Sequence, residues 1–498
     1  MQRRLLASLL ILVSGAASAQ SLRVGMAGDP ATLDPVQSVS FVDRVALIAI
    51  CDKLVDVDDK LAVVPQLATA WNWSPDGLAL TMTLRADILF QDGEPVDAEA
   101  VRFNIDRAKT ASYSKRKSEL TPVKGVVVVD PLTVRFELSE PYAPLLPALS
   151  DRAGMLVSPK AARELGERLT NRPVCAGAFK LAEWVPQDRI VLDRFDRYWN
   201  AAAIHFDRVT YLPVPDDGVR LANLLSGGFQ LTERVSPTDV AGLEGDKRVT
   251  LYQSPSVGYR LLSINLGGEG SKSPLGQDAK LREAFELALD RRTINEVAFD
   301  GRFIPSNQPE APQTPYYDAA HPVPARDVAR AKALVAASGR GRVPVTLMVS
   351  TDPLDGRVAQ VIQAMVSEAG FDLRIEVIEA GTALARLKSG AFGVALVIWS
   401  GRPDPDANIA LWVACDGYIN YSRYCRADLD GLLKQARGET DPAVRAGLYA
   451  RAASLYLADR PYVFLYHLRW FWGASARLKG LVPNPDGLVR LTGVRLER

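Results

Sequence analysis

An eight-residue segment after an apolar strand carries the side chains best suited to hold a ligand. It spans residues 399–406 and reads W-S-G-R-P-D-P-D. Tryptophan offers an aromatic surface at the strand end, and glycine allows the backbone to approach a bound molecule closely. A guanidinium can hold a carboxylate or a phosphate through two parallel hydrogen bonds. The segment therefore predicts a ligand-binding site, with the candidate contacts Trp399, Ser400, Gly401, Arg402 and Asp404.

The sequence contains none of the spacings that mark common catalytic or metal centres. His205, His321 and His467 lie in unrelated segments without metal-ligand spacing. The G-x-S-x-G, P-loop and H-E-x-x-H motifs are missing as well. The Asp-Pro-Asp pattern at 404–406 is more typical of turns than of acid–base catalysis. We therefore expect a binding protein without enzymatic activity, metal or cofactor. A secreted hydrolase is the alternative, which the missing nucleophile–base pair disfavours.

Alternating strands and helices precede this segment and must position it. Apolar strands are expected at 344–349, 373–378 and 394–399, with helices at 356–369 and 382–389 between them. This order is typical of a parallel sheet with buried strands. In such sheets, ligands bind just beyond the carboxyl ends of the strands. The rule points to the residues that directly follow the last of these strands.

Hydrophobic spacing also predicts elements in the rest of the chain. Helices are expected at 42–55 and 442–459, and Asp97 can cap a further helix. Strand-like runs occur at 261–266 and 461–466. With 498 residues, the chain exceeds what a single core usually supports, so we expect two or more lobes.

The first 19 residues have the composition of a secretory signal peptide. Arg3 and Arg4 form a basic start, the apolar run 5–13 is too short to span a bilayer, and A-S-A at 17–19 is a cleavage pattern. Because no cysteine stands at the cleavage site, we expect no lipid anchor. An uncleaved anchor is the alternative, although no long apolar stretch follows. The formal net charge of +1 argues against a nucleic-acid or anionic-membrane partner.

The four cysteines predict disulfides, because export permits them. Pairing Cys415 with Cys425 closes a short loop and is the economical choice, which leaves Cys51 with Cys175. These last two would approach each other if residues 51–175 formed an inserted lobe. Four cysteines allow three connectivities, so the other pairings stay open. A zinc site is disfavoured because CxxC-type spacing is missing.

Residues 70–106 form a turn–strand–turn–helix pattern with a recognisable sequence. They read A-W-N-W-S-P-D-G-L-A-L-T-M-T-L-R-A-D-I-L-F-Q-D-G-E-P-V-D-A-E-A-V-R-F-N-I-D. S-P-D-G suits a turn, and residues 78–85 alternate between apolar and polar side chains. This unit resembles the signature segment of extracellular solute-binding proteins of the peptide and nickel class, the receptor subunits of ABC importers. A second block, P-V-C-A-G-A-F-K-L at 173–181, resembles the same family, and the likeness covers nearly the whole mature chain.

The resemblance implies an α/β, two-lobed periplasmic binding protein fold with an extra inserted subdomain and the ligand between the lobes. The crossings near 259–263 and 472–474 would be the hinges on which the lobes close. The implied boundaries are 1–19 for the signal peptide, 20–45, 174–262 and 474–498 for lobe I, 46–173 for the inserted subdomain and 263–473 for lobe II.

The resemblance also implies a function. The mature chain would be a periplasmic, monomeric receptor that captures a small peptide or peptide-like solute. It would deliver this solute to the membrane permease subunits of an ABC importer. A metal-chelate, haem or sugar carrier of the same fold is the alternative within the family.

Arg402 departs from the family pattern at a position tied to the ligand. In peptide-binding members, the loop supplies an acidic side chain three residues after the tryptophan, and this side chain pairs with the ligand's ammonium group. A guanidinium cannot hold an ammonium group, so we expect Arg402 to contact an anionic group of the ligand instead. The alternative is a surface ion pair between Arg402 and Asp404 or Asp406 of the same loop.

Two other segments match the family's pocket. Val39, Ser40 and Phe41 correspond to the segment whose backbone pairs with the ligand, and the alternative is an ordinary loop before the helix. Tyr418 and Asn420 lie between the last two cysteines and would line the pocket wall. Local packing of this loop is the alternative.

Overall fold

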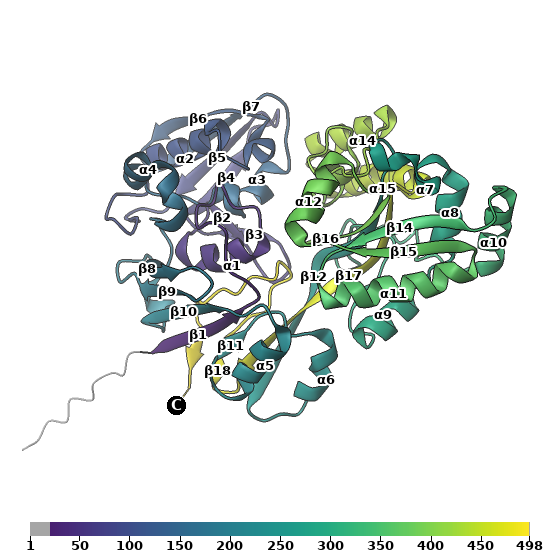
Figure 1. Cartoon of the computed structure of the whole chain (residues 1–498). Helices are drawn as coiled ribbons and strands as arrows, with labels where there is room; N and C mark the ends of the chain where they lie inside the picture. Colours follow the sequence, from purple (N-terminus) through teal and green to yellow (C-terminus); the bar gives the residue numbers. More distant parts are fainter. Residues whose placement is uncertain (1–19, 498) are drawn as a thin grey trace, which may run out of the picture.

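The computed structural model describes residues 20–497 and shows two lobes joined by long strands (Figure 1). The expected signal peptide at 1–19 lies outside the described residues. The first described strand and the C-terminus both belong to the same lobe, called lobe I here. No helix within residues 20–497 is both long and apolar enough to cross a bilayer.

Lobe I is built around β1 (Ser21–Met26), which pairs in parallel with β10 (Arg208–Pro213) on one side and β11 (Leu231–Thr232) on the other. Helix α1 (Phe41–Ile50) ends five residues before the helix expected at 42–55. It ends there because Cys51 takes an extended conformation and leads the chain into the next subdomain. The remaining elements are β8 (Phe179–Val185), β9 (Arg189–Arg194), α5 (Asp217–Leu225), α6 (Val240–Leu243), β18 (Leu478–Lys479) and β19 (Arg495–Leu496).

An inserted subdomain between β1 and β8 has its own sheet and its own core. The sheet is antiparallel in the order β4-β5-β7-β6, and helix α2 is capped by Asp97, as predicted, through a 2.8 Å bond to the Ala100 N–H. Buried side chains such as Leu80, Met82 and Phe136 form the core. The elements are β2 (Val55–Val57), β3 (Val63–Pro65), β4 (Ala68–Trp73), β5 (Ala79–Leu84), α2 (Ala98–Thr110), β6 (Val123–Asp130), β7 (Thr133–Leu138), α3 (Leu145–Ala148) and α4 (Pro159–Leu165).

Lobe II contains the predicted parallel strands, in the spatial order β15-β14-β16. Their alternation with helices is confirmed, and the helix expected at 442–459 is α15 (Pro442–Asp459). The other elements are α7 (Pro274–Gln277), α8 (Ala279–Leu287), α9 (Arg291–Phe299), β13 (Ile304–Pro305), α10 (Val328–Ala337), β14 (Val343–Val349), α11 (Pro353–Glu368), β15 (Phe371–Val377), α12 (Ala380–Ser389), β16 (Val394–Trp399), α13 (Pro405–Val413) and α14 (Ala427–Gly438).

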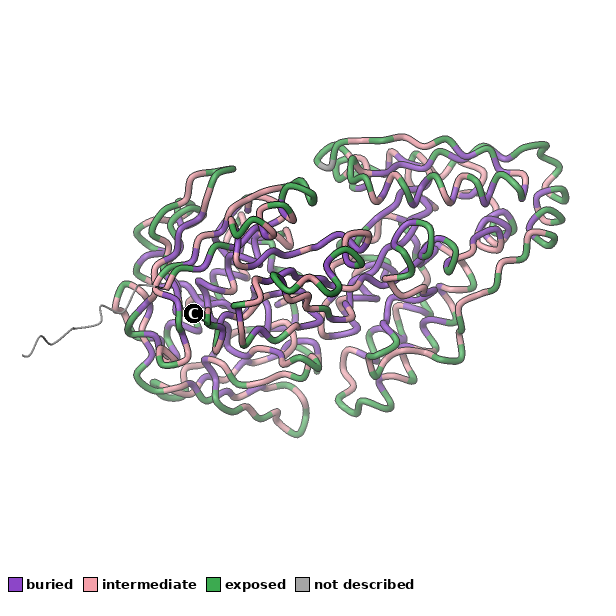
Figure 2. The backbone as a smooth tube through the Cα atoms, turned by 90° about the horizontal axis from the view of Figure 1, so that it is seen from below, coloured by how far each residue is buried: buried purple, intermediate pink, exposed green. Residues whose placement is uncertain are grey.

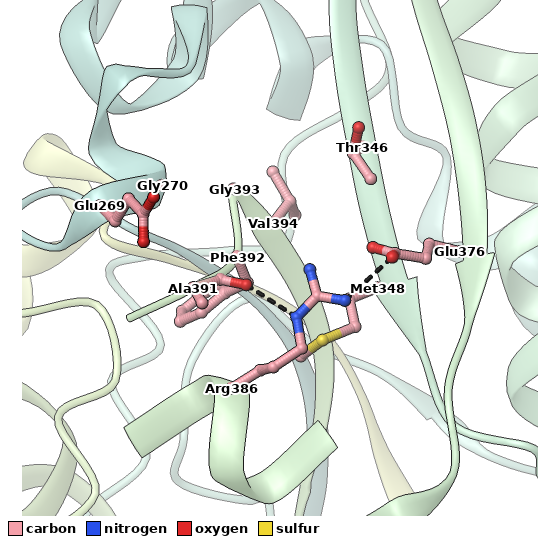
Figure 3. Close-up of a pocket in the computed structure, with 10 residues that line it drawn as sticks. All are labelled: Glu269, Gly270, Thr346, Met348, Glu376, Arg386, Ala391, Phe392, Gly393 and Val394. Atoms are coloured by element: carbon pink, nitrogen blue, oxygen red, sulfur yellow. Dashed lines mark hydrogen bonds and ion pairs between the residues drawn. The ribbon is translucent and has the colours of Figure 1, made fainter. Parts of the chain in front are cut away.

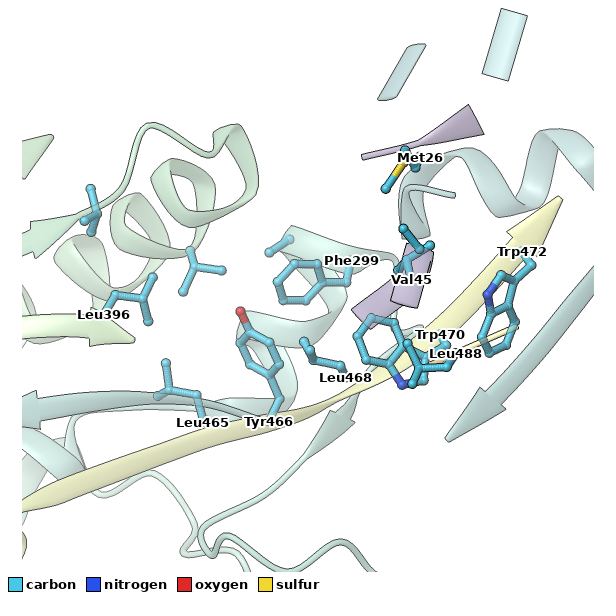
Figure 4. Close-up of a cluster of buried hydrophobic side chains, with 14 of the residues drawn as sticks. Met26, Val45, Phe299, Leu396, Leu465, Tyr466, Leu468, Trp470, Trp472 and Leu488 are labelled. Carbon is cyan, nitrogen blue, oxygen red and sulfur yellow. The ribbon is translucent and has the colours of Figure 1, made fainter. Parts of the chain in front are cut away.

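Two long antiparallel strands, β12 (Val249–Ile264) and β17 (Tyr462–Ser475), run from one lobe into the other. Both are much longer than the strands expected at 261–266 and 461–466. They merge the sheets of the two lobes into one, and large apolar side chains along β17 belong to a core that reaches into both lobes (Figure 4). The pairing register shifts between Pro255 and Tyr259, close to one expected hinge. The hinge positions themselves stay a prediction.

Both predicted disulfides form. The Cα atoms of Cys51 and Cys175 are 4.9 Å apart, and those of Cys415 and Cys425 are 4.4 Å apart. Buried residues run through the middle of both lobes, and exposed residues lie mainly around the periphery (Figure 2). The end of β16 pairs with β12, close to the crossing between the lobes.

Candidate functional site

The turn after β16 is held rigidly against β12. Gly401 has a φ of +76° and is buried, and a Cβ atom there would lie 2.4 Å from the backbone carbon of Val257. Only glycine fits this close approach without strain. The Asn408 carboxamide oxygen accepts the Trp399 indole N–H at 3.0 Å and the Arg402 backbone N–H at 2.8 Å. The turn therefore presents the Arg402 side chain from a fixed backbone.

Arg402 reaches out of lobe II to a carboxylate of the inserted subdomain. Its guanidinium lies 4.6 Å from the centre of the Trp399 ring, and Nη1 donates to Ser400 Oγ at 3.1 Å. Its Nε lies 3.3 Å from Oδ2 of Asp151. Burial lowers the pKa of Arg402 to about 10, and the attraction of Asp151 only partly opposes this effect. Arg402 thus joins the two lobes.

Asp151 is surrounded by guanidinium groups from three parts of the chain. Arg44 Nε lies 3.1 Å and Arg152 Nε lies 3.6 Å from Oδ1 of Asp151. Burial would raise the pKa of Asp151, but the guanidinium groups of Arg44, Arg152, Arg402 and Arg116 hold it well below its usual range. We call Arg44, Arg116, Arg152 and Arg402 the arginine cluster.

The arginine cluster carries more positive charge than its carboxylates can balance. Glu119, which pairs with Arg116, is the second carboxylate beside Asp151. Burial lowers the pKa of Arg152 well below its usual range, and the other arginines add to the effect against the pull of Asp151. Within residues 20–497, three buried N–H groups of the cluster make no hydrogen bond, namely Arg44 Nη1, Arg116 Nε and Arg152 Nε, of which Arg152 Nε still lies 3.6 Å from Asp151. Such an excess suits an anionic ligand, because buried charges need partners.

The segment that precedes α1 contacts the arginine cluster through its backbone. Arg116 Nη2 donates to the Ser38 carbonyl at 2.9 Å, and Arg152 Nη1 donates to the Ser40 carbonyl at 3.4 Å. Ser40 also caps α1 through a reciprocal pair of bonds with Asp43. The structure therefore brings residues 38–41 and the W-S-G-R turn to one site between the lobes.

The neighbours of Ser40 face different surroundings. Val39 is 58% exposed, and its backbone N–H is bonded to Asp43. Phe41 stacks on Trp470, with ring centroids 5.0 Å apart. On that ring, the guanidinium of Arg234 lies 4.8 Å from the centroid. The ligand contacts expected of Val39, Ser40 and Phe41 stay a prediction, although their place at the site supports it.

Further contacts hold the lobes together beside the arginine cluster. The Ala143 N–H donates to the Arg437 carbonyl at 2.8 Å across the lobes. Lys434 and Glu140 form an ion pair of 3.5 Å across the same gap. The structure therefore shows the lobes in contact around the site.

The two aspartates after the turn do not pair with Arg402 within the described residues. Asp404 binds Arg445 with both oxygens, at 2.6 and 2.8 Å, and caps α13. Asp406 pairs with Arg437 at 2.8 Å. The ion pair between Arg402 and Asp404 or Asp406 is therefore wrong as an alternative, and Asp404 has a structural role. Its contact with ligand stays a prediction.

Tyr418 and Asn420 belong to the loop closed by the second disulfide. Tyr418 is 61% exposed. The Asn420 amide donates to the carbonyls of Ala414 and Tyr424, at 2.8 and 2.6 Å, so this side chain holds the loop together. In the described part of the chain, no hydrogen bond or ion pair links either residue to the arginine cluster.

A separate hollow of about 510 Å³ lies on lobe II (Figure 3). Arg386 and Glu376 project into it and pair with each other at 2.9 Å, and Arg386 also donates to the Ala391 carbonyl. Arg386, the arginine that lines this hollow, is thus already paired. Within residues 20–497, no group of three His, Cys, Asp or Glu side chains is placed to hold a metal ion.

Sequence reasoning missed Asp151 and three of the four arginines of the cluster. One signal was present, because Asp43 and Arg44 are the only charged residues in the apolar helix α1. Arg116 directly precedes one short 3₁₀ turn and Arg152 begins another, and neither segment carries such a signal. Their roles depend on contacts between segments that are distant in sequence.

Glu310 is a buried carboxyl near Asp404 and Arg445 that offers a test of the site's electrostatics. Burial raises its pKa to about 7, and its Oε1 accepts no hydrogen bond from the described part of the chain. Because the folded-state pKa lies above the unfolded value, the stability that this group contributes is present at low pH. It is lost as the pH rises through about 7.

Replacing Glu310 with Gln, which mimics the protonated acid, should raise the free energy of unfolding at about pH 8. It should also flatten the decline between about pH 5 and pH 8, by up to about 1.4 kcal/mol per pH unit. Urea unfolding at several pH values measures this, with the exposed Glu183→Gln as the control variant. An unchanged pH profile in Glu310→Gln would contradict the prediction.

The chain resembles known proteins in both sequence and fold. The chain matches the model of bacterial extracellular solute-binding proteins, family 5 Middle, over residues 62–420. The glutathione-binding protein GsiB of Salmonella paratyphi A is 27% identical over 484 residues, covering 95% of this chain and 93% of GsiB. The periplasmic binding protein DppA of Helicobacter pylori, solved with the peptide STSA, matches with a TM-score of 0.85 and 25% identity, covering 96% of this chain and 99% of DppA.

Two structures of a further protein also match this chain. The Escherichia coli murein tripeptide-binding protein MppA matches with a TM-score of 0.86 and 23% identity, over 96% of this chain and 99% of MppA. An unliganded open form of MppA matches with a TM-score of 0.74, over 96% of this chain and 98% of MppA. Both matches show the same two-lobed fold.

Proposed function

The chain belongs to the bacterial extracellular solute-binding proteins of family 5, and from that membership we propose that it is the periplasmic solute-binding component of an ABC importer. It acts as a monomer, catalyses no reaction and needs no cofactor. Its two lobes close on a small solute and present it to the membrane permease subunits. The similarity to GsiB and to DppA over nearly the whole chain supports this proposal.

The proposed solute is a small peptide or peptide-like molecule with an anionic group. The observation that carries this proposal is the ion pair between Arg402 and Asp151, which lies in a buried cluster with excess positive charge. A ligand ammonium group would add to that excess, whereas an anionic group would reduce it. Trp399 supports the arginine by stacking, and the backbone near Ser40 lies beside the same cluster.

Replacing Arg402 with Ala should weaken solute binding by about 30-fold or more, because a desolvated charge partner is lost. Native mass spectrometry of the purified protein identifies the carried solute, and calorimetry measures its affinity. Arg386→Ala, at the separate hollow of lobe II, is the matched control and should bind normally. Unchanged affinity in Arg402→Ala, or a carried solute without any anionic group, would contradict the proposal.

A further inference from the structure

We propose that the arginine cluster binds a group with two negative charges, either one phosphate-like dianion or two carboxylates of the same solute. This inference rests on the proposed function, because it specifies the charge of the anionic group at that site. The group lies beside Arg402, between the lobes. Asp151 acts as a permanent counter-charge that sets how many negative charges the ligand must supply.

The guanidinium groups around Asp151 outnumber the carboxylates that pair with them. The cluster contains four guanidinium groups, and among the described residues Asp151 and Glu119 are the carboxylates that pair with them directly, whereas Asp43 reaches the cluster only through the Ser38 hydroxyl. Arginine keeps its proton in proteins, so the cluster cannot neutralise itself by losing protons. Two further negative charges would balance it. A monoanion would leave one buried guanidinium of the cluster without a directly paired negative charge, which is costly away from water.

The donor groups of the three buried arginines also favour such a ligand. Arg44, Arg116 and Arg152 are only 3%, 5% and 2% exposed, and within residues 20–497 each has one N–H that makes no hydrogen bond, although Arg152 Nε lies 3.6 Å from Asp151. They reach the cluster from α1, from the loop before the 3₁₀ turn η1 (Lys117–Leu120) and from the turn η2 (Arg152–Gly154). A tetrahedral oxyanion, or a pair of carboxylates, offers oxygen atoms in more than one plane. It can therefore accept from arginines that approach from different sides.

Closure of the two lobes also favours a ligand with two negative charges. Arg402 comes from lobe II, whereas Arg44, Arg116 and Arg152 all lie on the other side of the interlobe gap. Closing the lobes thus brings a fourth positive charge to three others, and Asp151 offsets only part of the repulsion. A dianion removes the remainder. The closing step itself therefore discriminates between ligands by their charge.

Simple anions test this charge preference without knowledge of the natural solute. The intact mature protein is heated in sodium sulfate, phosphate or malonate, and in acetate or chloride at matched ionic strength. We expect the three dianions to raise Tm by about 3 °C or more in a saturable manner, and the monoanions to have no such effect. Sulfate and phosphate are tetrahedral, whereas malonate carries two carboxylates, so the stronger response identifies which dianion fits.

Three variants separate specific binding from the general stabilising effect of salts. Arg402→Ala should abolish the saturable shift but keep any general salt effect, and Arg386→Ala should behave like the original protein. Asp151→Asn should tighten binding of sulfate roughly tenfold, because it removes a competing carboxylate. If Asp151 were only a structural clamp between the lobes, Asp151→Asn would instead weaken binding of every anion.

The outcomes distinguish this inference from the proposed function. Equal shifts with acetate and sulfate, or a sulfate shift that persists in Arg402→Ala, would overturn the dianion inference. If those results appear while Arg402→Ala still loses the carried solute, the proposed function stands without the dianion. If Asp151→Asn does not fold, the anion series on the original protein and on Arg402→Ala still decides.

Discussion

Replacing Cys51 and Cys175 with serine is expected to lower the free energy of unfolding by about 5 kcal/mol. The two cysteines are 124 residues apart in sequence, and a disulfide that closes a long loop removes much entropy from the unfolded chain. Both are fully buried where the chain enters and leaves the inserted subdomain. Urea unfolding of the oxidised protein and of the double variant measures the difference.

The second disulfide supplies the matched control. Cys415 and Cys425 are 10 residues apart, so replacing them with serine should cost only about 3 kcal/mol by the same argument. We also expect the first variant to lose the inserted subdomain's attachment to lobe I before lobe II unfolds. Equal losses for the two variants, or a larger loss for the short loop, would show that loop entropy does not govern these disulfides.

Replacing Asp404 with Ala is expected to lower the free energy of unfolding by about 3–5 kcal/mol. The change leaves the Arg445 guanidinium buried, at 5% exposure, without the carboxylate that binds it bidentately. It also removes the cap of α13, which adds about 1 kcal/mol. Because α13 follows the W-S-G-R turn, solute affinity should fall as well. Urea unfolding and calorimetry measure the two effects.

An exposed ion pair is the control for this prediction. Glu183 and Arg189 form a bidentate pair at the surface, and Glu183→Ala should cost less than about 1 kcal/mol. The double variant Asp404→Leu with Arg445→Met should recover much of the loss, because it leaves no unpaired buried charge. A loss below about 1 kcal/mol in Asp404→Ala would show that water reaches this pair.

Elements with strong local signals could be predicted from the sequence. The helix predicted at 442–459 is observed with the same bounds, and Asp97 caps α2 as expected. Both predictions succeed because caps and helical spacing depend on near neighbours. The strand–helix alternation before the W-S-G-R turn likewise predicted the parallel strands. The helix from residue 42 was overextended, because its end depends on the path into the inserted subdomain.

The candidate site could be predicted only in part. The W-S-G-R turn and its arginine stand out locally, and Arg402 does lie between the lobes. Its partner Asp151 could not be identified, because nothing near residue 151 marks that carboxylate as a partner of Arg402. The sequence suggested Asp404 or Asp406, which are near in the chain but are occupied by Arg445 and Arg437.

The sequence by itself determined the family, the two-lobed α/β fold and the place of the W-S-G-R turn at a strand end. The family and the two-lobed arrangement follow from the resemblance of residues 70–106 and 173–181, and the place of the turn follows from local patterns of apolar and turn residues. Only the tertiary structure decided the electrostatics of the site. The arginine cluster exists because the folded chain brings Arg44 and Asp151, 107 residues apart, next to Arg402 of the other lobe. Charges interact strongly only when they are close in space and shielded from water, and neither condition is written in the order of residues.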